Sequence, residues 1–125
     1  MVRNVFTTAD ALTEHWSPVA VAEANGQLVK IAKIKGEFVW HNHADEDEIF
    51  LVIKGVLTIR YRDRPDVVLN EGDIHTVPKG VEHCPVCEEE VVTLLFEPAA
   101  TAHTGNVTTD ITKSIEAQRA SLELS

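Results

Sequence analysis

The 125-residue sequence predicts a single all-β domain, a sandwich or a barrel. Short apolar stretches rich in Val and Ile, which favour strands, recur between residues 19 and 96. Gly, Pro, Asn and Asp separate these stretches at intervals of roughly 8–12 residues, as in β-sandwiches and barrels. No helical pattern recurs between the stretches, which argues against an α/β fold with a parallel sheet.

Composition and charge narrow the possible partners. Hydrophobic residues make up 44% of the chain, as in an ordinary globular protein, and the net charge is −9. This charge argues against binding to nucleic acid or to anionic membranes, and no apolar run approaches the ~20 residues that span a bilayer. The first residues show no signal-peptide pattern, so we expect a cytoplasmic protein whose two cysteines are thiols or metal ligands and not a disulfide.

The predicted elements begin with a short helix over residues 7–15, capped by Thr7 or Thr8. Asn25-Gly26 then predicts a hairpin between strands at 19–22 and 28–35. The second of these strands alternates only partly, which indicates a half-exposed face. We expect a helical N-terminal segment over 1–15, a β domain over 16–98 and a C-terminal extension over 99–125.

Further strands are expected at 49–53, 56–62, 67–69, 74–77 and 90–96. Residues 56–62 alternate cleanly, with Leu57, Ile59 and Tyr61 on one face. In the extension, the alternation at 107–111 predicts an edge strand, and residues 113–125 predict a weak helix or a disordered tail.

The stretch 36–55 carries the chemistry. His41 and His43 are two residues apart, so a strand would place both imidazoles on one face. A loop with four carboxylates follows, and the returning strand would bring Glu48 beside the histidines. Two imidazole nitrogens and one carboxylate make half of a metal site, which lacks a ligand from elsewhere in the chain.

The spacing of both clusters is similar to that of the cupin superfamily. In the first cluster Gly36 precedes His41-x-His43, four residues separate His43 from Glu48, and six residues lead to Gly55. In the second, Gly72 is followed at the expected spacing by Pro78-x-Gly80 and His83. Two positions depart from the pattern. Four residues instead of five separate Gly36 from His41, and Cys87 replaces an Asn.

This resemblance implies a cupin-type jelly-roll β-barrel that holds one divalent transition metal per chain through His41, His43, Glu48 and His83. Imidazoles with one carboxylate suit Fe, Mn, Ni, Co, Cu or Zn better than Ca or Mg. Four protein ligands would leave two adjacent positions on an octahedral ion for water, dioxygen or a chelating substrate. The alternative is a barrel whose histidines only fill its interior.

We therefore interpret the protein as a metal-dependent enzyme, a dioxygenase or an isomerase, acting on a small oxygen-rich or enolisable molecule. The alternative is a non-catalytic module that binds a small molecule or a sugar. No acid–base residue stands out, and the loops at 44–47 and 79–90 could add polar groups to the pocket. The pocket candidates are Phe50, Val52, Leu57, Ile59, Tyr61, His75 and Cys87.

Two further expectations concern association and the cysteines. The apolar segments 28–34 and 91–96 exceed what one barrel interior needs, which predicts a homodimer. Cys84 and Cys87 would point to opposite faces of an extended strand, so packed thiols are favoured over a redox switch.

Overall fold

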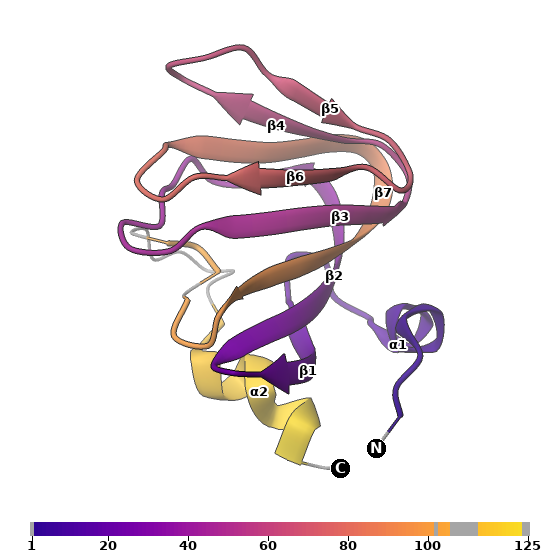
Figure 1. Cartoon of the computed structure of the whole chain (residues 1–125). Coiled ribbons are helices and arrows are strands. Elements are labelled where there is room, and N and C mark those ends of the chain that lie inside the picture. The colour runs from indigo at the N-terminus through magenta and orange to yellow at the C-terminus, as the bar shows by residue number, and fades with distance from the viewer. Residues whose placement is uncertain (1, 102, 106–112, 124–125) are drawn as a thin grey trace.

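The strands run antiparallel and curl around a common interior, with one helix near each end of the chain (Figure 1). The computed structural model describes residues 2–101, 103–105 and 113–123. Its elements are α1 (Val5–Ala11), β1 (Val19–Ala24), β2 (Gln27–Glu37), β3 (Glu48–Lys54), β4 (Leu57–Tyr61), β5 (Val67–Leu69), β6 (Ile74–Val77), β7 (His83–Pro98) and α2 (Ile115–Glu123). The mostly-β architecture with a short N-terminal helix agrees with the predicted fold class.

Strand β7 is the spine of the sheet. Its first half pairs with β4, and its second half pairs with β3, while β2 runs along its other edge for nearly the whole length. The strand order is β1-β2-β7-β3-β6, with β4 and β5 attached through β7. The register shifts between Ile34 and Gly36 and between Val52 and Lys54, and such bulges bend strands. The bent sheet therefore has a concave inner face.

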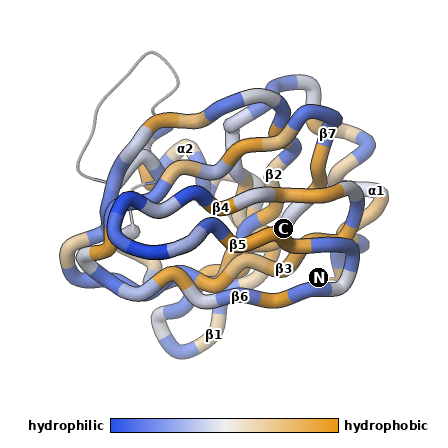
Figure 2. Tube along the Cα trace, turned by 90° about the horizontal axis from the view of Figure 1, so that it is seen from above, coloured by the Kyte–Doolittle hydropathy of each residue, from blue (hydrophilic) through white to orange (hydrophobic). Residues whose placement is uncertain are grey.

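The inner face carries the main hydrophobic core. It gathers residues from β2, β3, β4, β5, β6 and β7, and Figure 2 shows these apolar stretches along the strands with hydrophilic connections between them. The buried members are Ala32, Ile34, Phe50, Val52, Leu57, Ile59, Tyr61, Leu69, Val77, Cys87 and Val91. Burial of these side chains drives the sheet to close on itself.

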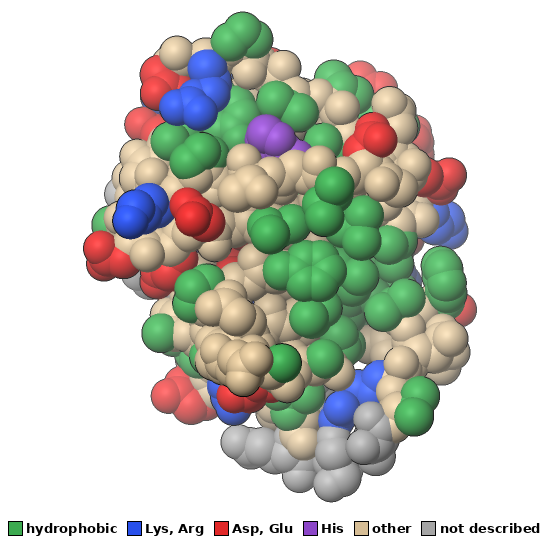
Figure 3. Space-filling model, in the orientation of Figure 1, with side chains coloured by type: hydrophobic (Ala, Val, Ile, Leu, Met, Phe, Trp, Pro, Cys, Tyr) green, Lys and Arg blue, Asp and Glu red, His purple; other side chains and the backbone are tan. Residues whose placement is uncertain are grey.

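A second apolar cluster lies on the outer face of the same sheet. Ala9 of α1 packs there, against a cluster that includes Ile31, Val92 and Leu94. Leu51 and Phe96 are only partly buried in this cluster. In Figure 3 a contiguous apolar area crosses the face that carries β2 and β3.

The predicted boundaries of the N-terminal helix were wrong. The helix begins at Val5 and ends at Ala11, because Asn4 is the N-cap and not Thr7 or Thr8. The Asn4 side chain accepts hydrogen bonds from the backbone N–H groups of Phe6 (2.9 Å) and Thr7 (3.0 Å). Asn is among the best N-cap residues, so it sets the start of the helix earlier in the chain.

Strand β7 is also longer than predicted. It begins at His83, so residues 83–90 are strand and not loop. The predicted hairpin at Asn25-Gly26 is present, with left-handed φ angles of 52° and 77°. The edge strand expected at 107–111 lies outside the described residues. Residues 115–123 form α2, which packs against β1.

Candidate metal centre

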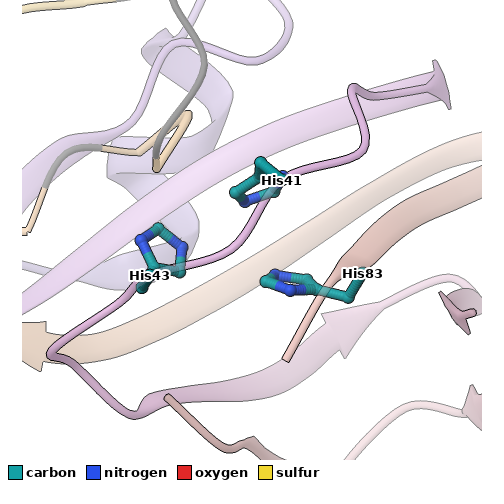
Figure 4. Close-up of side chains that lie close together, drawn as sticks. All are labelled: His41, His43 and His83. Carbon is teal, nitrogen blue, oxygen red and sulfur yellow. The ribbon is translucent and has the colours of Figure 1, made fainter. Parts of the chain in front are cut away.

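Main-chain hydrogen bonds bring the three histidines together. His41 and His83 exchange a pair of backbone bonds, with N···O distances of 3.0 and 2.9 Å, and the Gly80 N–H donates to the His43 carbonyl at 2.7 Å. His41 makes only this isolated bridge, so the regular strand expected through His41 and His43 is absent. The candidate ligand atoms of His41, His43 and His83 lie within 4.8 Å of one another, and all three side chains are buried (Figure 4).

The histidine rings are oriented by carbonyl groups of the chain. Nδ1 of His41 lies 2.9 Å from the Val39 carbonyl, and Nδ1 of His83 lies 2.9 Å from the Val81 carbonyl. A carbonyl only accepts, so each Nδ1 must carry the proton and each Nε2 has a free lone pair. Nε2 of His43 and of His83 are buried without a well-aligned hydrogen-bond partner. Buried imidazole nitrogens in this state suit a metal ion.

Glu48, the first residue of β3, lies beside two of these nitrogens. Its carboxylate oxygens are 3.5 Å from His43 Nε2 and 3.7 Å from His83 Nε2. These distances are long for hydrogen bonds. Two ligands about 2.1 Å from one ion would lie roughly 3.0–3.4 Å apart at angles of 90–110°, so the spacing is close to what a shared ion requires. The residues present therefore fit a metal.

The protonation states also favour a cation. Burial and the nearby His83 lower the pKa of His41 to about 4, which keeps this imidazole neutral. Burial raises the pKa of Glu48, but close contact with Glu97 and with His43 outweighs it and leaves the pKa well below its ordinary value. Burial and the Glu48 charge raise the pKa of Glu97 well above its ordinary value. Of the two carboxyl groups, Glu48 is therefore the one that loses its proton at the lower pH.

Sequence reasoning missed a buried polar network behind Glu48. Lys30 Nζ lies 2.7 Å from Glu97 Oε1, 2.6 Å from Gln118 Oε1 and 3.2 Å from the Thr101 carbonyl. The Lys30–Glu97 contact meets the distance of an ion pair. It does not have the geometry of a hydrogen bond, because neither Glu97 oxygen has a well-aligned donor. Strand β2 was expected to have a half-exposed face, yet the Lys30 side chain is 0% exposed. Only partners distant in sequence explain this burial.

An apolar cavity opens beside the histidines. Its residues come from the segment before β1, from β2, β3 and β7, from the connection between β2 and β3, and from the loop after β7. They are Trp16, Pro18, Ala32, Ile34, Phe38, His41, Glu48, Phe50, Pro85, Thr93, Leu95 and His103. The space between the wall atoms is about 410 Å³, part of it open to solvent. His41 and Glu48 thus connect the cavity to the candidate metal centre.

The structure distributes the pocket candidates over several places. Phe50 lines this cavity, whereas Val52, Leu57, Ile59 and Cys87 lie in the inner hydrophobic core. The Tyr61 hydroxyl forms a 2.6 Å hydrogen bond with His75 Nε2, and burial raises the pKa of Tyr61 to about 12. Cys84 and Cys87 are free, buried thiols.

Trp16 and His103 are cavity residues that sequence reasoning did not single out. Trp16 precedes the first strand, and its ring stacks on Phe38 with centroids 4.6 Å apart. His103 follows the last strand, and burial together with Lys30 lowers its pKa to about 4. Neither residue belongs to a motif, so no feature of the sequence indicated its position.

A curled antiparallel β-sheet with a buried histidine cluster beside an apolar cavity defines a jelly-roll class of protein with a candidate metal site. The family description "Cupin domain" (Cupin_2) matches residues 27–97. The chain therefore belongs to the cupin family.

Known relatives agree with this assignment. The uncharacterized protein YdbB of Bacillus subtilis (strain 168) is 34% identical over 82 residues, which are 66% of this chain and 73% of YdbB. A crystal structure of a cupin-2 domain containing protein from Shewanella frigidimarina is 43% identical, with a TM-score of 0.74, covering 78% of this chain and 94% of that one. Hydroquinone 1,2-dioxygenase from Sphingomonas sp. TTNP3 shares the fold at 20% identity, with a TM-score of 0.67, covering 76% and 72%.

Among the residues that the structure describes, no helix is long and apolar enough to cross a membrane.

Proposed function

We propose that the protein is a metal-dependent enzyme that carries out a dioxygenation or an isomerisation of a small oxygen-rich or enolisable molecule. His41, His43, Glu48 and His83 would hold one divalent transition metal. The observation that carries this proposal is the pair of buried Nε2 atoms, on His43 and His83, that face the Glu48 carboxylate without a well-aligned partner. When bound, the metal supplies Lewis acidity or redox chemistry.

The chain itself orients and shields this site. The Val39 and Val81 carbonyls fix the tautomers of His41 and His83, which aims their Nε2 atoms away from those carbonyls. The apolar walls of the cavity keep bulk water from the substrate, which strengthens electrostatic interactions inside it.

The polar groups on the described cavity wall favour dioxygenation over isomerisation. An isomerase needs a positioned side chain to move a proton. His103 Nε2 already accepts a 2.6 Å hydrogen bond from the Lys113 N–H, and the Thr93 hydroxyl lies 3.1 Å from the Leu51 carbonyl. The fold of a known dioxygenase is similar, which supports the same choice. A reaction without a side-chain base fits this wall best.

Metal content tests the ligand set. Protein purified without an affinity tag should contain close to one transition metal per chain by plasma mass spectrometry. His43→Ala and His83→Ala should each lose most of it, and metal should no longer raise their melting temperatures. His15→Ala is the matched control, because His15 lies at the surface against Glu90. Unchanged metal content in both cluster variants would refute the site.

Turnover tests catalysis. Protein loaded with Fe, Mn, Ni or Zn should consume dioxygen or convert at least one member of a panel of diketones, phenols and sugars, and Glu48→Gln should be inactive. Tight binding of a panel member by protein that converts none of them would establish the non-catalytic binding module instead.

We further propose a cytoplasmic homodimer that uses the outer apolar cluster as its interface. Leu51 and Phe96 of this cluster are partly exposed, and Ile74, paired with Leu51, is 63% exposed. Exposed contiguous apolar surface normally marks an interface. The free cysteines agree with a reducing compartment. We also propose the division into an N-terminal segment 1–15, a barrel domain 16–98 and an extension 99–125.

A further inference from the structure

The cavity beside His41 and Glu48 is narrow. Although about 410 Å³ separates its wall atoms, the positions open to the centre of a water-sized molecule total only about 40 Å³. One water centre needs about 10–15 Å³, so this space holds roughly three waters. A bulky, puckered molecule would have to push the walls apart. A thin molecule fits with much smaller movements.

Aromatic rings form part of the wall. Trp16 and Phe38 are stacked with an interplanar angle of 15°, and Phe50 is a further wall residue on β3. Flat aromatic faces give the most favourable contacts to another flat π-system.

The wall offers few hydrogen bonds beyond the His41 and Glu48 side. The Thr93 hydroxyl lies 3.1 Å from two backbone carbonyls, and His103 Nε2 accepts from the Lys113 N–H. A sugar would bury several hydroxyl groups here without partners, which costs free energy for each of them. An occupant with one polar end toward His41 and an apolar body elsewhere has no such cost.

Trp16 is held firmly in this wall. Its backbone N–H donates to the Lys33 carbonyl at 2.9 Å, and its indole N–H donates to the Lys35 carbonyl at 2.9 Å. Its φ angle is 57°, a left-handed conformation that bulky residues adopt only when their surroundings impose it. Two anchors on β2 therefore impose a strained backbone at Trp16, a residue of the cavity wall.

We propose that the cavity binds a flat, ring-containing molecule with one oxygen at its edge, such as a phenol or a conjugated enol, and that Trp16 determines this specificity. The inference rests on the proposed function for the direction of the oxygen, which would point to the histidine cluster. The preference for flatness depends only on the cavity walls.

The test compares ring shapes of equal size. The probes are phenol and cyclohexanol, which both have six carbons and one hydroxyl, together with glucose and 2-naphthol. Binding to metal-replete protein is measured by calorimetry and by Trp16 fluorescence in a Trp40→Phe background. Trp40 is the only other tryptophan, and it lies under the Arg62 guanidinium at 4.1 Å. Phenol should bind about tenfold more tightly than cyclohexanol and should quench Trp16, and glucose should not bind.

Trp16→Ala should reduce the preference for phenol over cyclohexanol several-fold and should raise the affinity for 2-naphthol above that for phenol. Trp16→Phe should retain most of the preference, and Trp40→Ala is the control for an unrelated tryptophan. Equal binding of phenol and cyclohexanol, binding of neither, or an unchanged preference in Trp16→Ala would overturn the proposal.

The same titrations on chelator-treated protein separate this inference from the proposed function. A phenol preference that survives without metal supports the cavity assignment even if no metal is found at the histidines. Loss of metal binding with the ring preference intact would refute only the metal centre.

Discussion

Replacing Lys30 with methionine is expected to be one of the most damaging substitutions outside the histidine cluster. The Lys30 and Glu97 side chains are 0% and 1% exposed, and their charged atoms are 2.7 Å apart. Lys30→Met removes the cation, together with its contacts to Gln118 and to the Thr101 carbonyl, and leaves Glu97 buried. Methionine has a similar length, so the change removes charge more than volume.

The expected loss is about 3–5 kcal/mol of the free energy of unfolding, the usual cost of removing one partner from a buried ion pair. Native domains have only about 5–15 kcal/mol in total. At this chain length 1 kcal/mol corresponds to a shift in Tm of roughly 3–6 °C, so Tm should fall by roughly 10–30 °C. Burial raises the pKa of Glu97 in the folded protein and Lys30 counteracts this shift, so the pKa of Glu97 should rise further without Lys30. The deficit of Lys30→Met should therefore grow as the pH rises.

Urea and thermal unfolding of a double-mutant cycle would measure this coupling. Glu97→Gln alone leaves Lys30 charged and buried, so it should also destabilise. The double variant, Lys30→Met with Glu97→Gln, should recover at least about 2 kcal/mol relative to the sum of the single changes. Lys33→Met is the matched control, because Lys33 lies on the same strand, is partly buried and bonds the Leu12 carbonyl at 3.2 Å. The reasoning is refuted if Lys30→Met costs no more than Lys33→Met, or if the single effects simply add.

Three further predictions concern acid stability, a turn and association. The pKa of His41 is about 4 in the folded protein and about 6.5 in the unfolded chain, so metal-free protein should lose up to about 3 kcal/mol of stability as the pH falls from 6.5 to 4. Urea unfolding of His41→Gln should show a flatter dependence of stability on pH, and an unchanged dependence would contradict this. Gly55→Ala should destabilise by more than Gly72→Ala in thermal unfolding, by about 1–3 kcal/mol. Both glycines have φ near 90°, but a Cβ at Gly55 would lie 2.9 Å from the Glu90 carbonyl oxygen, whereas a Cβ at Gly72 would meet open space. Equal losses of stability in the two variants would argue against the steric cause. Sedimentation should give twice the 13.8 kDa chain mass for the wild type and a folded monomer for Ile74→Asp, and a monomeric wild type would exclude the dimer.

Local patterns predicted those parts of the fold that depend on neighbouring residues. Asn25-Gly26 set its hairpin because both residues tolerate left-handed backbone, and this preference is visible in the sequence. The resemblance of the two histidine clusters to a known family predicted that His83 lies beside His41, although 41 residues separate them in the sequence. A family resemblance carries information on topology that periodicity alone does not.

The start of β7 and the N-cap of α1 were predicted wrongly because the sequence carries conflicting signals at both places. Pro85 and the polar run 88–90 concealed the first half of β7, because proline and consecutive acids are poor strand formers. Pro85 lacks an N–H, yet its carbonyl accepts from the Phe38 N–H at 3.0 Å, so the strand is held there by its partners. Asn4 likewise out-competed Thr7 as an N-cap.

The burial of Lys30 and Glu97 could not be predicted, because each is costly to bury alone and acceptable only with partners from β2, β7 and α2. From sequence alone, a lysine in a strand is expected to be exposed, because the residue that pairs with it is not known. Trp16 is a similar case. Its strained backbone is held by hydrogen bonds from Trp16 to the carbonyls of Lys33 and Lys35. Both lysines lie on β2, which follows β1 in the chain.

This network also explains how the charge at the candidate metal centre is arranged. The pKa of Glu48 lies well below its ordinary value, partly through contact with Glu97, whereas the pKa of Glu97 lies well above its ordinary value. Lys30 contacts Glu97 at 2.7 Å. As the pH rises, negative charge therefore develops first on the Glu48 oxygens that lie beside His43 and His83, where a divalent cation would gain most from it. Because β7 carries His83 at its start and Glu97 near its end, one bent strand positions both the nitrogen ligand and the group that keeps its carboxylate neighbour charged.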